Sequence, residues 1–157
     1  MRLDITTARC VIRPFLVSDL DGFMEYRNDQ AWMRYQGFKG RSKEEYATVL
    51  MMDHSLTEGR QLAIADKASG HLIGDLYLQQ DGDTVWIGYT IHPRFARQGY
   101  AYEAVSALCN WARGQGFSVK AGVLQGNDAS IGLLTKLGFL MTGTSAEGEL
   151  VFTLHGI

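Results

Sequence analysis

The sequence is poor in the residues that build disulfide and metal sites. Its 157 residues include only two cysteines. Cys10 stands in a strand-like run and Cys109 in a helical pattern, and neither has metal-ligand spacing around it. The four histidines are scattered, without an HxH or HxxxH grouping, at His54, His71, His92 and His155. We therefore predict buried, inert thiols and no metal centre.

Long apolar runs and an excess of either charge are also missing. No run approaches the roughly 20 apolar residues that cross a membrane, and residues 1–15 contain no apolar core of signal-peptide length. We therefore expect a cytoplasmic protein. The formal net charge is -2, with 20% charged and 46% hydrophobic residues, which argues against nucleic-acid binding by bulk electrostatics. The length is that of a single domain, 1–157, with one core.

Strand and helix patterns alternate along the chain. Ser18 is typical of a helix N-cap, and Ser42 with Glu45 forms a capping box that opens another helix. Helices are predicted over 19–27, 43–56, 100–115 and 129–137, and strands over 9–14, 61–66, 71–80, 84–91, 118–124, 139–144 and 150–155. Turn residues between the strands 61–66, 71–80 and 84–91 indicate an antiparallel meander, and the last two strands are expected to form a closing hairpin. The order favours an α+β fold.

The longest helical pattern, Tyr100 to Gln115, carries one apolar stripe. The stripe repeats at helical spacing through Ala101, Ala104, Val105, Leu108, Cys109 and Ala112. We expect it to be buried against the sheet. A strand precedes and a strand follows this helix, which predicts one parallel strand pair around it.

The segment ARQGY in front of this helix has the features of an anion site. Gly99 allows a close backbone approach or a positive φ, and free N–H groups with the helix dipole favour a negative ligand. Arg94 and Arg97 add positive charge to the same place. The segment is neither a Walker loop nor a GxGxxG loop. Taken alone, it is explained equally well as a turn with solvated arginines.

Two longer motifs decide between these interpretations. YTIHPRFARQGYAYEA, followed by QGNDASIGLLTKLGF, resembles the paired signature of the GNAT superfamily of acetyl-CoA-dependent N-acetyltransferases. The opening LDITTARCVIRPFLVSDL is similar to the branch that acetylates ribosomal-protein N-termini, the Rim-type enzymes. The resemblance implies a GNAT fold, with a central, mostly antiparallel sheet of six to seven strands, a parallel splayed strand pair and four flanking helices. It also implies acetyl transfer from acetyl-CoA to a primary amine by direct attack in a ternary complex.

The resemblance also implies a set of residues for the acetyl-CoA site. The phosphate loop of the family has the pattern Q/R-x-x-G-x-G/A. Ala96 stands at its first position, so this chain lacks the Gln or Arg side chain that the family has there. Backbone amides provide most of the pyrophosphate binding in this loop, and Arg94 or Arg97 can offset the missing side chain. The cofactor residues implied are Tyr89, Thr90, Ile91, Arg94, Arg97, Gln98, Gly99, Tyr100, Ala101, Asn127 and Ser130. A buried strand and an Asx turn are the alternative roles of Tyr89–Ile91 and Asn127.

The acid and base slots of the family are both altered. Much of the superfamily has a tyrosine seven residues after the motif asparagine, where this chain has Leu134, so we predict Ser130 as the proton donor to the leaving thiolate. Capping of its own helix is the alternative for Ser130. Rim-type relatives often carry a glutamate where Trp86 stands, and Asp83 is then the nearest carboxylate for the base. A plain hairpin turn is the alternative role of Asp83. The position of Glu103 in the helix favours a structural role.

The acceptor side is the least explicit part of the sequence. The resemblance places it at the first two helices and their loop, where Trp32, Tyr35 and Phe38 lie close together, and Trp86 would make it more apolar. Core packing is an alternative role for these aromatic residues. The acceptor is a protein N-terminus or a small amine, and a homodimer is compatible with the resemblance. Because Leu134 and Trp86 stand at the acid and base positions, an acetyl-CoA sensor without transferase activity is an alternative. A nucleic-acid-binding domain is disfavoured by the net charge.

Overall fold

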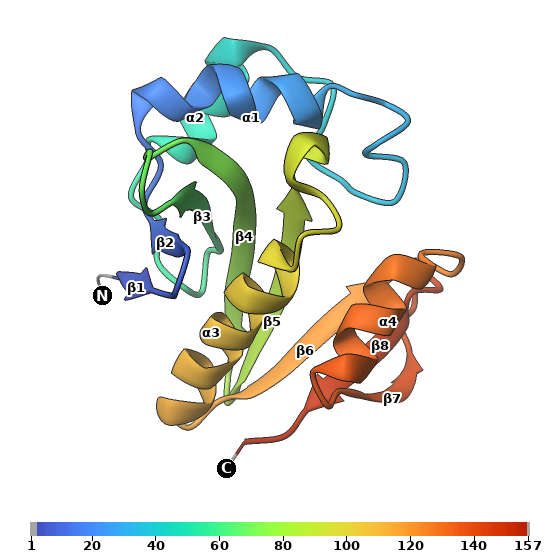
Figure 1. Ribbon diagram of the computed structural model, residues 1–157. Helices are drawn as coiled ribbons and strands as arrows, with labels where there is room; N and C mark the ends of the chain where they lie inside the picture. The colour runs from blue at the N-terminus through green and yellow to red at the C-terminus, as the bar shows by residue number, and fades with distance from the viewer. Residues whose placement is uncertain (1–2, 157) are drawn as a thin grey trace.

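The chain forms one eight-stranded sheet with helices on both faces (Figure 1). The computed structural model describes residues 3–156. The strands are β1 (Ile5–Thr6), β2 (Cys10–Arg13), β3 (Arg60–Asp66), β4 (Leu72–Asp81), β5 (Thr84–Ile91), β6 (Ser118–Val123), β7 (Leu140–Thr144) and β8 (Leu150–Leu154). The α-helices are α1 (Leu20–Arg27), α2 (Lys43–Leu50), α3 (Tyr100–Gly114) and α4 (Asp128–Lys136), and 3₁₀ turns cover Val17–Asp19 and Pro93–Phe95. Among the described residues, no helix is long and apolar enough to cross a membrane.

The sheet contains one parallel pair, which splays open. The strand order is β1-β2-β3-β4-β5-β6-β8-β7, and β5 with β6 is the parallel pair within the described chain. Only residues 84–86 of β5 face residues 118–120 of β6. On its other edge β6 pairs with β8 from Val119 to Val123, while β5 stays on β4 along its whole length. Figure 1 shows the two strands diverging from a common base. The expected α+β fold with a splayed parallel pair and four helices is confirmed.

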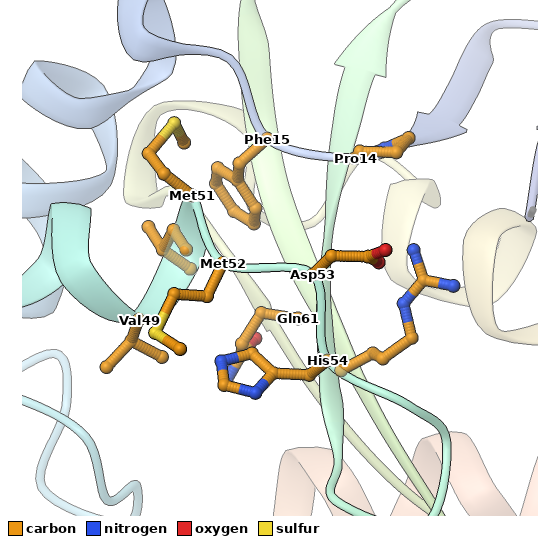
Figure 2. Close-up of a pocket in the computed structure, with 10 residues that line it drawn as sticks. Pro14, Phe15, Val49, Met51, Met52, Asp53, His54 and Gln61 are labelled. Atoms are coloured by element: carbon orange, nitrogen blue, oxygen red, sulfur yellow. The ribbon is translucent and has the colours of Figure 1, made fainter.

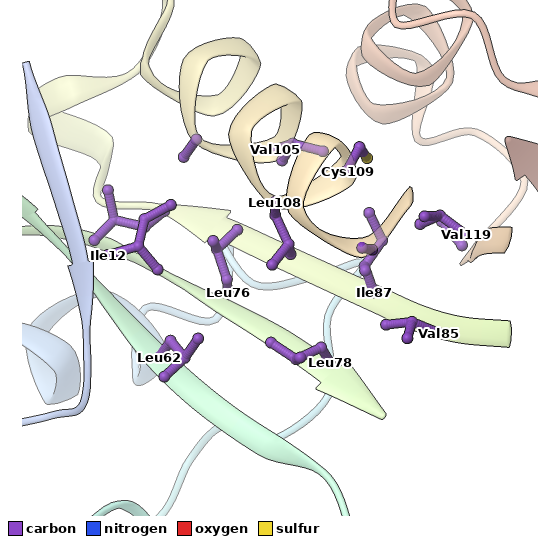
Figure 3. Packing of buried hydrophobic residues seen from close by; sticks show 14 of the residues in the cluster. Ile12, Leu62, Leu76, Leu78, Val85, Ile87, Val105, Leu108, Cys109 and Val119 are labelled. Atoms are coloured by element: carbon purple, nitrogen blue, oxygen red, sulfur yellow. The ribbon is translucent and has the colours of Figure 1, made fainter. Parts of the chain in front are cut away.

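The sheet separates two apolar layers. Alternate side chains such as Leu76 and Leu78 pack with the stripe of α3 and with Leu134 of α4, and we call this side the α3 face. Figure 3 shows Val105 and Leu108 above the strand residues of this layer. The other side, the α1 face, is covered by α1 and α2, whose aromatic residues form a second cluster. The predicted stripe is confirmed, since all its members except the half-buried Ala101 are buried.

A buried ion pair fastens α1 to the sheet. Arg27 in the last turn of α1 donates to Asp75 of β4 at 2.6 Å, and both side chains are at most 5% exposed. The Tyr26 hydroxyl also donates to Asp75. Rotating the Gln61 amide adds a donor to the same carboxylate at 3.2 Å. Three donors therefore satisfy a charge that would be costly to bury alone.

Three local predictions need correction. The sheet has eight strands because residues 5–6 add a short edge strand to β2, too short to show a period. The second helix ends at Leu50 and not near residue 56, because Ser55 and Glu58 form their own capped turn. Ser18 does not cap α1. The carboxylate of Asp19 accepts the Leu16 N–H at 2.7 Å and creates a 3₁₀ turn before the helix.

Candidate functional site

The second half of β5 presents a backbone edge to the gap between β5 and β6. The Asp83 carbonyl accepts the Ser118 N–H at 3.0 Å, so the backbone groups of every second residue from Asp83 onward point to the β6 side. By this alternation the N–H groups of Tyr89 and Ile91 face the gap. The backbone of Thr90 instead belongs to the ladder with β4. An extended ligand in the gap can therefore pair with β5 as a missing strand would.

The loop at the far end of this edge is shaped for an anion. Arg97 and Gly99 both have left-handed backbones, with φ of 61° and 83°. Gly99 is the N-cap of α3 and provides no side-chain cap, so the N–H groups of the first turn remain for another acceptor. Arg94 and Arg97 lie exposed beside them. The helix dipole and these cations favour a phosphate group at this position.

Arg9 and Glu103 hold this loop in place. The Glu103 carboxylate accepts hydrogen bonds from the Arg9 backbone N–H at 2.8 Å and from Arg9 Nε at 2.7 Å. The Arg9 guanidinium also donates to the Gln98 carbonyl at 3.0 Å and lies 4.0 Å from the centre of the Tyr100 ring. Burial raises the pKa of Glu103, but the hydrogen bonds from Thr7 and Arg9 together outweigh it and lower the pKa. Glu103 is thus a structural anion, as predicted.

Two hydroxyl groups meet across the gap on the α3 face. The hydroxyls of Ser130, in the first turn of α4, and Tyr89, on β5, are hydrogen-bonded to each other. Burial raises the pKa of Tyr89 to about 12, so its phenol stays protonated near neutral pH. The Asn127 side chain accepts the Ser130 N–H at 3.4 Å, the capping role that asparagine often fills. Leu134 is fully buried in the core.

A carboxylate lies over β6 on the opposite face of the sheet. Glu149 comes just before β8, and Leu150, the next residue, packs on the α3-face core, so Glu149 lies on the α1 face. Its carboxylate atoms are 3.4 Å from the position that a Cβ on Gly122 of β6 would occupy. At the base of the splay, Lys120 Nζ is 5.8 Å from the Trp86 ring centre. The gap therefore has hydroxyls on its α3 face, and the carboxylate of Glu149 lies over β6 on the α1 face.

The structure does not bring Asp83 to this region. Asp83 lies in the turn between β4 and β5, at the strand end opposite to Tyr89. Six residues of extended chain separate the two, which is about 20 Å at roughly 3.3 Å per residue. An aspartate side chain is much shorter than this distance, so Asp83 cannot reach an amine above the second half of β5. The hairpin role, left open as the alternative, is the one its position fits.

The predicted acceptor aromatics are spread along the α1 face. Trp32 donates from Nε1 to the Ile91 carbonyl at 2.9 Å, at the end of β5. The Tyr35 hydroxyl lies 3.5 Å from the position of a Cβ on Gly126, so the loop after α1 reaches the loop after β6. Phe38 packs in the α1-face cluster and lines a cavity. Three residues of one loop thus lie at three different places: the end of β5, the loop after β6 and the α1-face cluster.

Comparison with known proteins identifies the family. The acetyltransferase (GNAT) domain family matches residues 9–140, most of the chain. The chain belongs to this family. Over 111 residues it is 28% identical to an uncharacterized N-acetyltransferase, YnaD, of Bacillus subtilis (strain 168), a match that covers 69% of this chain and 65% of that protein.

Solved structures show the same fold. A GNAT-family acetyltransferase from Bacillus anthracis superposes with a TM-score of 0.84 at 20% identity, over 98% of both chains. RimL, a ribosomal L7/L12 alpha-N-protein acetyltransferase solved with coenzyme A, gives 0.83 at 16% identity over 98% of both chains. Spermidine N-acetyltransferase from Vibrio cholerae, solved with CoA and spermine, gives 0.75 at 18%, over 93% of this chain and 94% of that one.

Three side chains of this GNAT site were missed by sequence reasoning. They are Arg9, Glu149 and the phenol of Tyr89, which was predicted for its backbone alone. Arg9 and Glu149 lie far along the chain from the motifs, and neither has a local pattern of its own. The alternation of β5 carries a signal for Tyr89, because it predicts that Tyr89 shares a face with Ile87.

Proposed function

We propose that this GNAT protein transfers an acetyl group from acetyl-CoA to a primary amine by direct attack within a ternary complex. The observation that carries the proposal is the uncapped start of α3 at the end of an open strand edge. A pyrophosphate fits the first, and an extended amide chain such as pantetheine fits the second. The donor would thus lie along β5 with its thioester between Tyr89 and Ser130 on one face and Glu149 on the other.

Donor binding is assigned residue by residue. The amides over Arg97 to Ala101 bind the pyrophosphate, with Arg94 and Arg97 adding charge where the loop lacks its first family side chain. The N–H groups of Tyr89 and Ile91 pair with the pantetheine arm, and the first also polarises the thioester carbonyl. Asn127 positions α4, whose start borders the thiol.

Ser130 and Tyr89 act together at the leaving group. Attack of the amine forms a C–N bond, and the C–S bond then breaks to release a thiolate. The Ser130 hydroxyl donates its proton to that sulfur, the Tyr89 phenol, hydrogen-bonded to Ser130, replaces it, and solvent then reprotonates the phenol. Because the phenol stays protonated near neutral pH, the pair is ready to donate in every turnover. This pair takes the place of the tyrosine that Leu134 replaces.

Glu149 is the base in this proposal. The amine must lose a proton before or during attack, and an amine above Gly88 on the α1 face approaches from the side where Glu149 lies. Acid and base then stand on opposite faces of the thioester, so neither blocks the other. Asp83 is too remote for this role, and the Trp86 slot has no titratable group.

The acceptor is a protein N-terminal residue or a small amine. The Rim-type resemblance of the opening sequence favours the first, and RimL is described as an alpha-N-protein acetyltransferase. Spermidine N-acetyltransferase shares the fold and extends the class to small amines. An acetyl-CoA sensor without transferase activity is the less supported alternative, because the family that the chain matches is one of acetyltransferases.

An acceptor screen tests the proposal. Release of free CoA thiol from acetyl-CoA would be measured with N-terminal peptides, amino-acid amides and polyamines. We expect turnover with at least one class and a fall in kcat of about 10- to 100-fold in Ser130→Ala. Tight acetyl-CoA binding without acetylation of any amine would support the sensor instead. Full activity of Ser130→Ala would remove the acid role of the pair.

A further inference from the structure

Two adjoining cavities lie beneath α2 on the α1 face, outside the donor site. One has a volume of about 320 Å³ and the other about 180 Å³. They share Val49, His54 and Gln61, and we call them together the α2 pocket. Figure 2 shows the residues around the smaller cavity, with Met51 and Met52 from the end of α2. The combined volume is that of a small-molecule site.

The strand register places this pocket at the level of the gap. Gln61 of β3 is opposite Tyr77 of β4, and Tyr77 is opposite Gly88 of β5. The three residues form one row across the α1 face, with neighbours about 4.8 Å apart. Gly88 has no side chain, and the Tyr77 Cβ lies 3.6 Å from the place where one would stand. The pocket therefore opens about 10 Å from the backbone of Gly88, along a floor made by Tyr77.

The Tyr77 ring is held against the pocket wall by a glycine. Its hydroxyl donates to the Gln79 side chain at 3.2 Å. A Cβ on Gly59 would come within 2.1 Å of that hydroxyl, and Gly59 has a φ of 100°. Only glycine fits both demands without strain. This close approach fixes the aromatic floor that leads from Gly88 to the cavity.

The walls of the larger cavity are mainly apolar and aromatic, formed by Phe38, Val49 and Tyr77 with His54 and Gln61. The smaller cavity is more polar, because Asp53, His54 and Arg60 line it together with Phe15 and the methionines that follow α2. The carboxylate in the larger cavity, Glu58, accepts the Ser55 N–H at 3.0 Å, and this hydrogen bond lowers its pKa. The Glu58 carboxylate is thus already engaged in a hydrogen bond within its own turn. The larger cavity therefore favours an uncharged, bulky group over a cationic chain.

We propose that the α2 pocket selects an acceptor whose reactive amine is next to a large apolar side chain, an aromatic one above all. This proposal rests on the proposed function, because it places the amine over Gly88. An α-amino group there directs its own side chain along Tyr77 toward Phe38 and Val49. Polyamines and alanine-like acceptors leave the pocket unfilled. The methionines at its edge adapt to side chains of different shape.

A matched acceptor series tests the proposal. Initial rates would be compared for phenylalaninamide, leucinamide, alaninamide and spermidine, with acetyl-CoA saturating. We expect kcat/KM for phenylalaninamide to exceed that for alaninamide by about tenfold or more. Val49→Trp fills the pocket and brings this ratio to within about threefold. Thr48→Trp, on the same helix but outside both cavities, keeps the wild-type ratio.

Binding measured by calorimetry separates this proposal from the proposed function. Phenylalaninamide should bind the wild-type protein more tightly than alaninamide, and Val49→Trp should remove the difference, whether or not acetyl transfer follows. Turnover of all amines at equal kcat/KM, or a preference for spermidine, would overturn the pocket while leaving the transferase intact. Selective binding of phenylalaninamide without turnover of any amine would support the pocket and refute the transferase.

Discussion

Arg9 and Glu103 are 94 residues apart in the chain, yet Nε of the first lies 2.7 Å from Oε1 of the second. This contact joins the edge of the sheet to the first turn of α3. It also brings a guanidinium to the carbonyl of Gln98, inside the phosphate loop. The loop geometry thus depends on a residue outside every motif.

We expect Arg9→Ala to raise KM for acetyl-CoA about tenfold, because it removes the hydrogen bonds of the guanidinium to Glu103 and to the Gln98 carbonyl. The effect on kcat should be small, since Arg9 does not border Ser130. Initial rates at varied acetyl-CoA measure both constants. Lys67→Ala, which removes a cation from a neighbouring exposed turn, is the charge-matched control. An unchanged KM in Arg9→Ala would show that the loop holds its shape without this contact.

The Tyr89–Ser130 pair predicts coupled effects on kcat. Ser130→Ala should lower kcat about 10- to 100-fold, and Tyr89→Phe should lower it less, because serine remains as the direct donor. The double variant should lose less than the product of the two, as residues that act in one hydrogen-bonded chain do. Thr135→Ala, a hydroxyl on α4 bonded to its own helix, is the control. Multiplicative losses would mean that the two hydroxyls act independently.

Glu149→Gln tests the base. We expect kcat/KM near neutral pH to fall about 100-fold, because the amine must then lose its proton to water. The deficit should shrink as pH rises toward and above the amine's own pKa, roughly 8 for an α-amino group. A pH profile of both proteins measures this. Glu147→Gln, an exposed residue of the same turn, should keep the wild-type profile. A deficit that is constant with pH would contradict proton abstraction by Glu149.

Asp75→Asn should be strongly destabilising. It leaves Arg27 charged and buried beside a neutral amide, and breaking such a pair typically costs about 3–5 kcal/mol. Urea unfolding followed by fluorescence gives the change in the free energy of unfolding. Asp21→Asn removes an exposed carboxylate paired with Lys43, and it should change stability by less than about 0.5 kcal/mol. Similar losses in the two variants would mean that Asp75 is not the anchor of α1.

The buried thiol and phenol predict alkaline destabilisation. Burial raises the pKa of Cys109 from 9.0 to about 12 and that of Tyr89 from 10.0 to about 12. Both groups stay neutral in the folded state at a pH where they ionise in the unfolded chain. Their stabilisation is therefore complete below pH 9 and is lost as pH rises from there to about 12. Urea unfolding at several pH values measures the slope, and Cys109→Ala should flatten it between pH 9 and 10.

Much of the fold follows from local patterns. The stripe of α3 repeats at helical spacing, and strands β3 to β5 alternate with turn residues between them, so their type and order can be read directly. The end of α2 could not be predicted from its own pattern, because it is decided by the competing turn of Ser55 and Glu58. The edge strand of residues 5–6 exists only because β2 lies beside it.

The candidate site divides in the same way. The phosphate loop is a local feature, since Gly99 and the start of a helix suffice to expose N–H groups. Asp83 was chosen because it is near in sequence, but a strand carries its two ends about 20 Å apart. Glu149 is distant in sequence and reaches the gap because β8 pairs with β6.

Local sequence patterns predict most of the elements, the family resemblance and the loop that suits a phosphate, because each depends on residues a few positions apart. The tertiary structure alone decided which groups share the gap. Packing of α3 on the sheet brings Arg9 to Glu103, and pairing of β8 with β6 brings Glu149 to Gly122. The crossover through α3 opens the space in which Tyr89 meets Ser130. These contacts span long stretches of chain, and no local period of side chains encodes them.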